Sequence, residues 1–398
     1  MIEKIVCEDR CAGCGACENI CPQNCIKLKI QKDGFFYPNV DKKFCIQCNM
    51  CLRVCPVLSQ ENKTKMNKEF DYKVYAAYSK NTDVREKSSS GGIFSELAIK
   101  VLENGGYVVG AAFNNKMELE HTLISDVNEL DKLRGSKYVE SRVGDIYRQI
   151  KNKIEMKKKV LFVGTPCQIT GLKNFLPLRY HEQVYFITFI CHGVPSSKSW
   201  KLFISELENK YKSKIKSIQF RDKTYGWKNY RLCIQLGKRV YKEFFGDGYW
   251  YRAFEQNIFL RKSCYDCRFK LEKLNSDICL GDLWGVEKYL PVFDQKLGSS
   301  AVLIETNKGE QLFKSIMKDI VFEPIDIDNV KKYNSSLVKP SSYTVNRDYF
   351  FELQLKYGFI KSIDLIFFNS LYKQIKKIIK KIFKTIYLKI NSFKKVKE

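Results

Sequence analysis

Apolar residues recur along the central part of the chain at two alternating spacings. Val74 to Tyr78, Val108 to Phe113 and Val160 to Val163 are short, mostly apolar runs of the length that buried strands have. Between the first two, Gly92 to Glu103 places its apolar residues on one side of a helix, which Asn104-Gly105-Gly106 would end. The alternation predicts an α/β sheet with helices packed on it.

The alternation continues farther along the chain. Asp126 and Glu129 have the spacing of a capping box, and a helix is expected near Gly144 to Met156. Val184 to Ile190 then reads as another buried strand. Nearer the start, Ile26 to Ile30 and Phe35 to Tyr37 flank an Asp33-Gly34 turn, which predicts a hairpin.

Two identical cysteine patterns occupy the first sixty residues. Each has three cysteines at positions i, i+3 and i+6, followed by a Cys-Pro pair, and the second pattern repeats the first at an offset of 34 residues. The first consists of Cys11, Cys14, Cys17 and Cys21-Pro22, and the second of Cys45, Cys48, Cys51 and Cys55-Pro56. This is the pattern of bacterial two-cluster ferredoxins, in which the fourth cysteine of each run binds the other cluster.

The interleaving assigns two [4Fe-4S] sites. Cys11, Cys14, Cys17 and Cys55 should hold one cluster, and Cys45, Cys48, Cys51 and Cys21 the other. Structural zinc also uses Cys-x2-Cys pairs, but it takes four ligands rather than interleaved triplets. Disulfides are the other alternative that a cysteine-rich chain presents.

Three loops of the larger region carry residues suited to binding. Ser88 to Gly92 opens a helix whose free amides and hydroxyls would suit a phosphate, although such residues are often only an N-cap. Gly164 to Cys167 and Cys191 to Gly193 each follow a buried strand, at the end of a sheet where ligands bind.

Eight cysteines lie outside the two patterns. Cys264 and Cys267, together with Cys167 and Cys191, would suffice for a third cluster, but buried free cysteines are common and spacing supports it only weakly. The other four are expected to be packing residues: Cys7, Cys25, Cys233 and Cys279.

At these loops the sequence resembles the beta subunits of the coenzyme F-420 (deazaflavin) hydrogenases and dehydrogenases, with a ferredoxin unit in front. The resemblance covers roughly residues 70 to 320. It rests on Ser90-Gly91-Gly92-Ile93, Gly135-Ser136-Lys137-Tyr138, Thr165-Pro166-Cys167-Gln168, Cys191, Cys264 with Cys267, and Asp277-Ile278-Cys279-Leu280-Gly281-Asp282.

The resemblance implies cofactors and roles. Members of the family look like flavoproteins that bind FAD beside one cubane, and the family's cluster cysteines match Cys167, Cys191, Cys264 and Cys267. It implies that FAD is held by Ser90, Gly91, Gly92, Ser136, Lys137 and Tyr138. Lys137 is a candidate for contact with the flavin or the substrate, and the alternative is that it is an ordinary surface lysine in a loop. His192 is a candidate proton donor, and the alternative is a loop histidine whose ring nitrogens are hydrogen-bonded within the protein.

The implied function is an iron-sulfur flavoprotein oxidoreductase. Electrons would pass between the ferredoxin-type clusters and an FAD that exchanges a hydride with an organic substrate or deazaflavin. His192-Gly193-Val194-Pro195 is similar to the bacterial branch of the family, which leaves a pigment, a sugar derivative or a carrier as further substrates. The alternative is a non-catalytic relay subunit that feeds a partner enzyme.

Charge and composition narrow the partners. Lys and Arg number 69 against 44 Asp and Glu, a formal charge of +25, which suggests an anionic partner such as a redox protein or a membrane surface. A nucleic-acid role is not expected, because the basic residues concentrate in the tail without a binding motif. We expect a cytoplasmic protein, since neither an apolar leader nor a spanning segment is present in the sequence.

The C-terminal segment has the most unusual composition of the chain. Leu371 to Ile390 places isoleucines on one helical face and lysines on the other, which predicts a basic amphipathic helix. It would lie on an anionic membrane surface or dock on protein.

The expected class is α/β (α+β). A two-[4Fe-4S] ferredoxin domain at 1–60 and a polar linker at 61–72 precede an FAD and [4Fe-4S] oxidoreductase domain at 73–340 and a helical basic tail at 341–398.

Overall fold

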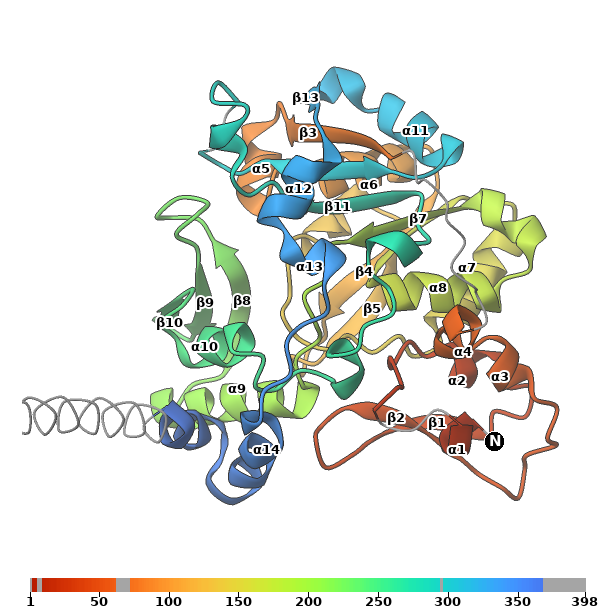
Figure 1. Cartoon of the computed structure of the whole chain (residues 1–398), viewed down its shortest axis with the longest axis vertical. Helices are drawn as coiled ribbons and strands as arrows, with labels where there is room; N and C mark the ends of the chain where they lie inside the picture. The colour runs from red at the N-terminus through yellow and green to blue at the C-terminus, as the bar shows by residue number, and fades with distance from the viewer. Residues whose placement is uncertain (1, 6–8, 62–71, 294–295, 368–398) are drawn as a thin grey trace, which may run out of the picture.

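The computed structural model describes residues 2–5, 9–61, 72–293 and 296–367. The N-terminal unit lies beneath the large mixed sheet, next to α8 (Pro166–Phe175), and a smaller antiparallel sheet lies on the other side of the molecule (Figure 1). Its elements are α1 (Ile2–Ile5), α2 (Ala16–Ile20), β1 (Ile26–Ile30), β2 (Phe36–Val40), α3 (Met50–Arg53) and α4 (Pro56–Glu61). The expected hairpin is present, with Ile26 opposite Val40 in an antiparallel pair.

The large sheet has eight strands in the order β13-β3-β12-β11-β7-β6-β4-β5. Strands β4, β6, β7 and β11 run parallel, whereas β5, β12 and the pair β3 and β13 add antiparallel neighbours. The bounds are β3 (Lys73–Ser79), β4 (Tyr107–Phe113), β5 (Leu119–Ile124), β6 (Val160–Gly164), β7 (Val184–Phe189), β11 (Ile278–Asp282), β12 (Ser300–Ile304) and β13 (Ile320–Pro324).

Helices cover both faces of this sheet because its strands are apolar on both sides. One face packs on α6 (Ile93–Glu103) and α11 (Asn307–Lys314), and the other on α7 (Ile146–Glu155), α8 (Pro166–Phe175) and α12 (Ile327–Tyr333). The shorter helices are α5 (Thr82–Lys87), α13 (Ser335–Val338), and the three-ten turns η1 (Val127–Lys132), η2 (Leu178–Gln183), η3 (Lys262–Cys264), η4 (Leu271–Lys273), η5 (Val286–Lys288) and η6 (Met317–Asp319).

A second core joins the N-terminal unit to the smaller sheet. That sheet comprises β8 (Ile215–Asp222), β9 (Arg231–Leu236) and β10 (Arg239–Phe244). Buried aromatic residues from α9 (Ser197–Tyr211), α10 (Tyr249–Glu255) and α14 (Asn346–Tyr357) pack in the same cluster as Phe35 and Tyr37 of the N-terminal unit. The iron-sulfur region is therefore part of the fold rather than a separate appendage.

The expected mixed α/β class is confirmed by the eight-stranded mixed sheet with helices on both of its faces. Residues 359–367 form a further helix whose Phe359 and Ile363 are fully buried in the second core, so this part of the expected tail belongs to the packed structure. The amphipathic helix expected over Leu371 to Ile390, and most of the linker, lie outside the described residues. Within the described part of the chain, no helix combines the length and apolarity that crossing a membrane requires.

Candidate functional site

The first cysteine site is formed by a short loop that carries three cysteines and by a fourth cysteine from a distant part of the sequence. Cys11, Cys14, Cys17 and Cys55 line one cavity, the set expected from the interleaved motifs. Gly13 and Gly15 have φ of 66° and 76°, a conformation that glycine adopts without strain and that lets the loop wrap around the cavity.

The second cysteine site has the complementary set. Cys21, Cys45, Cys48 and Cys51 line a second cavity. A fifth thiol also lines it, because Cys25 Sγ lies 3.3 Å from Cys21 Sγ. Cys25 was expected to be a packing residue. The tight turn between α2 and β1 places it beside this site instead, and no spacing rule predicts such a turn.

The third cysteine site lies at the carboxyl ends of parallel strands. Cys167 follows β6 in the first turn of α8, Cys191 follows β7, and Cys264 and Cys267 come from the loop after α10. All four line one cavity, so the structure brings together residues that are up to 100 positions apart. Ala12 and Val57 of the N-terminal unit line the same cavity.

Local contacts hold the third site in place. Thr165 and Gln168 form a capping box at the start of α8, and Thr165 Oγ1 lies 3.1 Å from Cys167 Sγ. Burial raises the pKa of Cys191 well above its ordinary value, and the ammonium of Lys270 acts in the opposite direction. Lys270 Nζ donates to the carbonyl oxygen of Cys191 at 2.8 Å, which places a positive charge where thiolates would gather.

The first and third cysteine sites are in contact. A Cβ added at Gly171 would lie 3.0 Å from Cys14 Sγ, so α8, which begins beside Cys167, packs directly on the first site. Burial, then Cys55 and Cys17, and finally Cys167 raise the pKa of Cys14. The fully buried Arg261 donates to the carbonyl oxygen of Cys11 at 3.1 Å and forms an ion pair with the buried Glu140.

The two loops expected to hold FAD are neighbours. The amide of Ser136 donates to Ser89 Oγ at 2.5 Å, which joins the loop before α6 to the 135–138 loop. The helix start itself is filled by the chain's own residues. Gly91 N donates to Ser300 Oγ at 3.0 Å, and a Cβ at Gly92 would lie 3.0 Å from a methyl group of Val84. The glycines of this helix start therefore leave no room for a ligand beside their Cα atoms.

The two candidate catalytic residues are both tied to the protein. Lys137 Nζ donates to the carbonyl oxygens of Leu133, Arg134 and Gly135, and burial lowers its pKa to about 7. His192 lines the third cavity and has a partner on each ring nitrogen, Ser336 Oγ at 3.1 Å and Asn257 Oδ1 at 2.6 Å. These contacts favour the satisfied loop residue in both cases.

A basic and aromatic cluster, consisting of Arg221, Lys223, Tyr138, Trp227 and Trp284, adjoins the serine loop. Trp227 Nε1 donates to the carbonyl oxygen of Ser89, and the Trp227 and Trp284 rings stack at 4.5 Å. Arg221 donates to Tyr138 OH at 3.2 Å and pairs with Asp282 at 2.7 Å.

Arg221 has unused hydrogen-bonding capacity. Its side chain is 4% exposed, yet Nε and Nη2 have no partner among the described residues. Burial, together with the charges of Arg221 and Arg85, lowers the pKa of Lys223 to about 7, and its Nζ donates to the carbonyl oxygens of Arg85 and Leu297. A buried cation with free donors suits an anion. No motif marks Arg221 in the sequence, because it is one residue of an ordinary alternating strand.

A site for a single metal ion would need a different arrangement of side chains from these cysteine cavities. Among the residues that the structure describes, no group of three or more His, Cys, Asp or Glu side chains is placed to hold one metal ion.

Comparison with known families accounts for the arrangement of the sites. Residues 10–58 match the 4Fe-4S dicluster domain, which covers the first two cysteine sites. Residues 74–146 match the N-terminal model, and residues 157–330 the C-terminal model, of the coenzyme F420 hydrogenase/dehydrogenase beta subunit. The chain belongs to this family. The resemblance drawn from the sequence is thus confirmed, as are iron-sulfur clusters in the N-terminal unit.

Individual relatives share parts of the chain. One subunit of the F(420)H(2) dehydrogenase of Methanosarcina mazei is 28% identical over 202 residues, which are 48% of this chain and 55% of that protein. The coenzyme F420-dependent sulfite reductase of Methanocaldococcus jannaschii is 29% identical over 192 residues, 46% of this chain and 28% of that enzyme. The chain thus spans about half of the first relative and less of the second. An uncharacterized protein of M. jannaschii is 25% identical over 354 residues, 81% of this chain and 92% of its own length.

One solved structure is similar. A chain of the F420-reducing [NiFe] hydrogenase complex from Methanosarcina barkeri has a TM-score of 0.47 and 18% identity, and the match covers 70% of this chain and 91% of that one.

Proposed function

We propose that this protein is an iron-sulfur flavoprotein oxidoreductase that passes electrons between three [4Fe-4S] clusters and an FAD. One observation carries the proposal. The third cysteine site and the basic and aromatic cluster both lie at the carboxyl ends of the parallel strands, where Cys167 follows β6, Cys191 follows β7 and Asp282 ends β11. Redox groups bound at these two places would be neighbours.

The donor sets fit the proposed groups. Each cysteine cavity is lined by at least the four thiols that a cubane needs, and Cys25 at the second cavity and Cys279 at the third are additional. The unpartnered nitrogens of the buried Arg221 guanidinium fit the negative charge of a flavin diphosphate or of a reduced flavin ring. Bound there, FAD would supply the exchange between single electrons and a hydride given to or taken from an organic substrate or deazaflavin.

The chain's own residues have distinct parts in this scheme. Ser89 and Ser136 fix the two flavin loops against each other. The stacked Trp227 and Trp284 form an apolar wall that excludes water beside Arg221. Lys270 and Arg261 place positive charge beside the third and first cysteine sites and so favour their thiolate forms.

The test is to characterise the full chain purified without oxygen. We expect non-covalent FAD and about twelve irons per chain, and loss of the flavin absorbance when reduced deazaflavin is added. Iron without flavin would contradict the proposal.

A relay role is the alternative function. Lys137 and His192 are both held by protein atoms, which favours a role in structure over one in catalysis. In that case the chain would bind FAD and take electrons from a reduced one-electron donor, but would exchange no hydride with deazaflavin or other organic substrates unless a partner protein were added.

A further inference from the structure

The loop from Asp41 to Asn49 presents two large apolar side chains to solvent next to the second cysteine site. Phe44 is 63% exposed and Ile46 61% exposed, although neither belongs to a helix or strand. Lys42 and Lys43 precede them and are also exposed, and neither pairs with an acidic residue of the described chain. Large apolar side chains that remain in water beside lysines mark an interaction surface.

This loop also belongs to the second cysteine site. Cys48 is exposed at the surface, and Ile46 lines the cavity that Cys21, Cys45 and Cys51 enclose. The first site is adjacent to the third, whereas the second site includes Cys48, the exposed cysteine among the described residues. An external electron carrier that contacts this loop would therefore reach a cysteine of the second site directly.

We propose that residues 41–49 are the docking surface for an acidic one-electron carrier protein of the ferredoxin type. The inference rests on the proposed electron-transfer function and names its protein partner. The carrier would lose one electron and the cluster of the second site would gain one, with no bond made or broken. Phe44 and Ile46 would be covered by the carrier, while Lys42 and Lys43 would attract its carboxylates.

Charge favours this occupant over the others. The chain has a formal charge of +25, which opposes the association of two copies and favours an acidic partner. A lipid surface would suit the lysines, but it would not explain why a cysteine of the second site is exposed in the middle of the patch.

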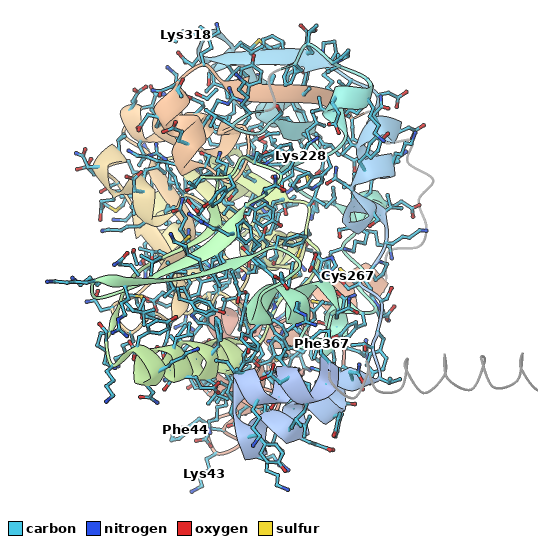
Figure 2. All side chains as sticks on the ribbon, turned by 90° about the vertical axis from the view of Figure 1, so that its left-hand side faces the viewer. Lys43, Phe44, Lys228, Cys267, Lys318 and Phe367 are labelled. Atoms are coloured by element: carbon cyan, nitrogen blue, oxygen red, sulfur yellow. The ribbon has the colours of Figure 1, made fainter. Side chains whose placement is uncertain are left out.

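The test measures the rate at which a reduced acidic bacterial ferredoxin reduces the full-length, cluster-loaded chain in an anaerobic stopped-flow instrument. Lys43→Glu should lower the second-order rate constant about tenfold at low ionic strength and weaken its dependence on salt. Lys318→Glu is the matched control, because Lys318 is exposed at the opposite end of the molecule from Lys43 and Phe44 (Figure 2). Its rate should stay close to that of the wild type.

The apolar part of the patch is tested separately. Phe44→Ala should raise the ferredoxin concentration needed for half-maximal rate about fivefold, the equivalent of roughly 1 kcal/mol of lost burial. Leu178→Ala, which removes a side chain that is 83% exposed outside the patch, should have no such effect.

A second reductant separates this proposal from the function on which it rests. Reduced sulfonatopropyl viologen is a small molecule with a net charge of only −1 and needs no docking surface, so it should reduce all four variants at close to the wild-type rate. A wild-type chain that accepts no electrons from viologen would refute the electron-transfer function. A chain that accepts them, but whose reduction by ferredoxin is the same in Lys43→Glu and Lys318→Glu, would refute the docking surface alone.

Two further outcomes would assign the patch to another occupant and overturn the proposal. One is wild-type self-association in sedimentation that Phe44→Ala abolishes while the ferredoxin rate is unchanged. The other is binding to phosphatidylserine vesicles that Lys43→Glu abolishes, again with an unchanged ferredoxin rate.

Discussion

The hydroxyl of Ser263 donates to the carbonyl oxygen of Cys11 at 3.0 Å. The loop that carries Cys264 and Cys267 therefore rests directly on the loop that carries the first three cysteines of the chain's first motif. Arg261, from the same loop, reaches the carbonyl oxygen of Phe36 at 2.9 Å and so also contacts the hairpin. The contact fixes the first and third cysteine sites in one orientation, as an electron path between them requires.

The iron content tests the third site. Wild-type protein should contain about twelve irons, and Cys264→Ser/Cys267→Ser about eight, because four ligands are needed for each cubane. Cys233→Ser is the control, since Cys233 lies in β9 and lines none of the three cysteine cavities. Iron analysis gives the number of irons per chain, and the absorbance of the thiolate-to-iron charge-transfer bands provides a second measure of cluster content. A wild-type value near eight would mean that the third site holds no cluster.

Arg221 provides the sharpest test of the flavin site. Gly92→Glu would disturb the fold by itself, because Gly92 has φ of 87° and its neighbours Val84 and Ser79 fill the space of a side chain. Arg221→Gln instead removes a charge with two unpartnered nitrogens and should lower the flavin content at least several-fold while the iron content stays near twelve.

Two variants complete the flavin experiment. Arg239→Gln changes an exposed arginine of β10 and should retain flavin. Arg221→Lys keeps the charge but loses the planar fork, so an intermediate flavin content is expected. Full flavin occupancy in Arg221→Gln would place the FAD elsewhere.

The sequence predicted what short-range spacing determines. Cys11, Cys14 and Cys17 lie within one loop, so their motif predicted iron-sulfur clusters in the N-terminal unit, and the family model confirms a 4Fe-4S dicluster domain there. The strands at Val74, Val108, Val160 and Val184 were predicted within a residue or two because burial on both faces makes them continuous apolar runs.

Contacts between distant segments were not predictable in this way. Arg221 of the small sheet pairs with Asp282 at the end of β11 in the large sheet, and Lys270 reaches Cys191 from a segment without a regular pattern. The family resemblance, rather than spacing, joined Cys167 to Cys264. For the same reason the buried aromatic residues of 346–367 gave no sign that this segment packs in the second core.

The ion pair of Arg261 and Glu140 should dominate the stability of the junction. Arg261 is 1% exposed and Glu140 6% exposed, so Arg261→Met leaves a buried carboxylate without its charge partner. We expect a loss of about 3 to 5 kcal/mol in the free energy of unfolding. Arg261→Met/Glu140→Gln should recover part of it, because the amide has no charge to leave unpaired.

Anaerobic urea unfolding followed by far-ultraviolet circular dichroism measures both variants. Arg239→Met serves as a control for loss of an exposed arginine and should change stability by less than about 0.5 kcal/mol. A double variant that is less stable than Arg261→Met alone would contradict the buried-pair explanation.

We expect the buried His121 to make the free energy of unfolding depend on pH. Burial lowers the pKa of His121 to about 4, against about 6.5 for an unfolded histidine. Below pH 6.5 the unfolded chain binds a proton that the folded chain does not bind until about pH 4. The contribution of His121 is therefore complete above pH 6.5 and is lost as the pH falls toward 4, on the order of 3 kcal/mol in all.

His121→Phe isolates this contribution. The new ring can still stack on Phe162, which lies 5.4 Å from the His121 ring, but the hydrogen bond to Ser141 is lost and no group titrates. At pH 7.5 the two proteins differ only by that constant packing change, so the comparison concerns slopes. Urea midpoints measured at intervals from pH 7.5 to 5 should fall more steeply in the wild type than in His121→Phe. Equal slopes would show that His121 is not the buried neutral group that its surroundings indicate, since a histidine that protonates in the folded state contributes nothing to the pH dependence.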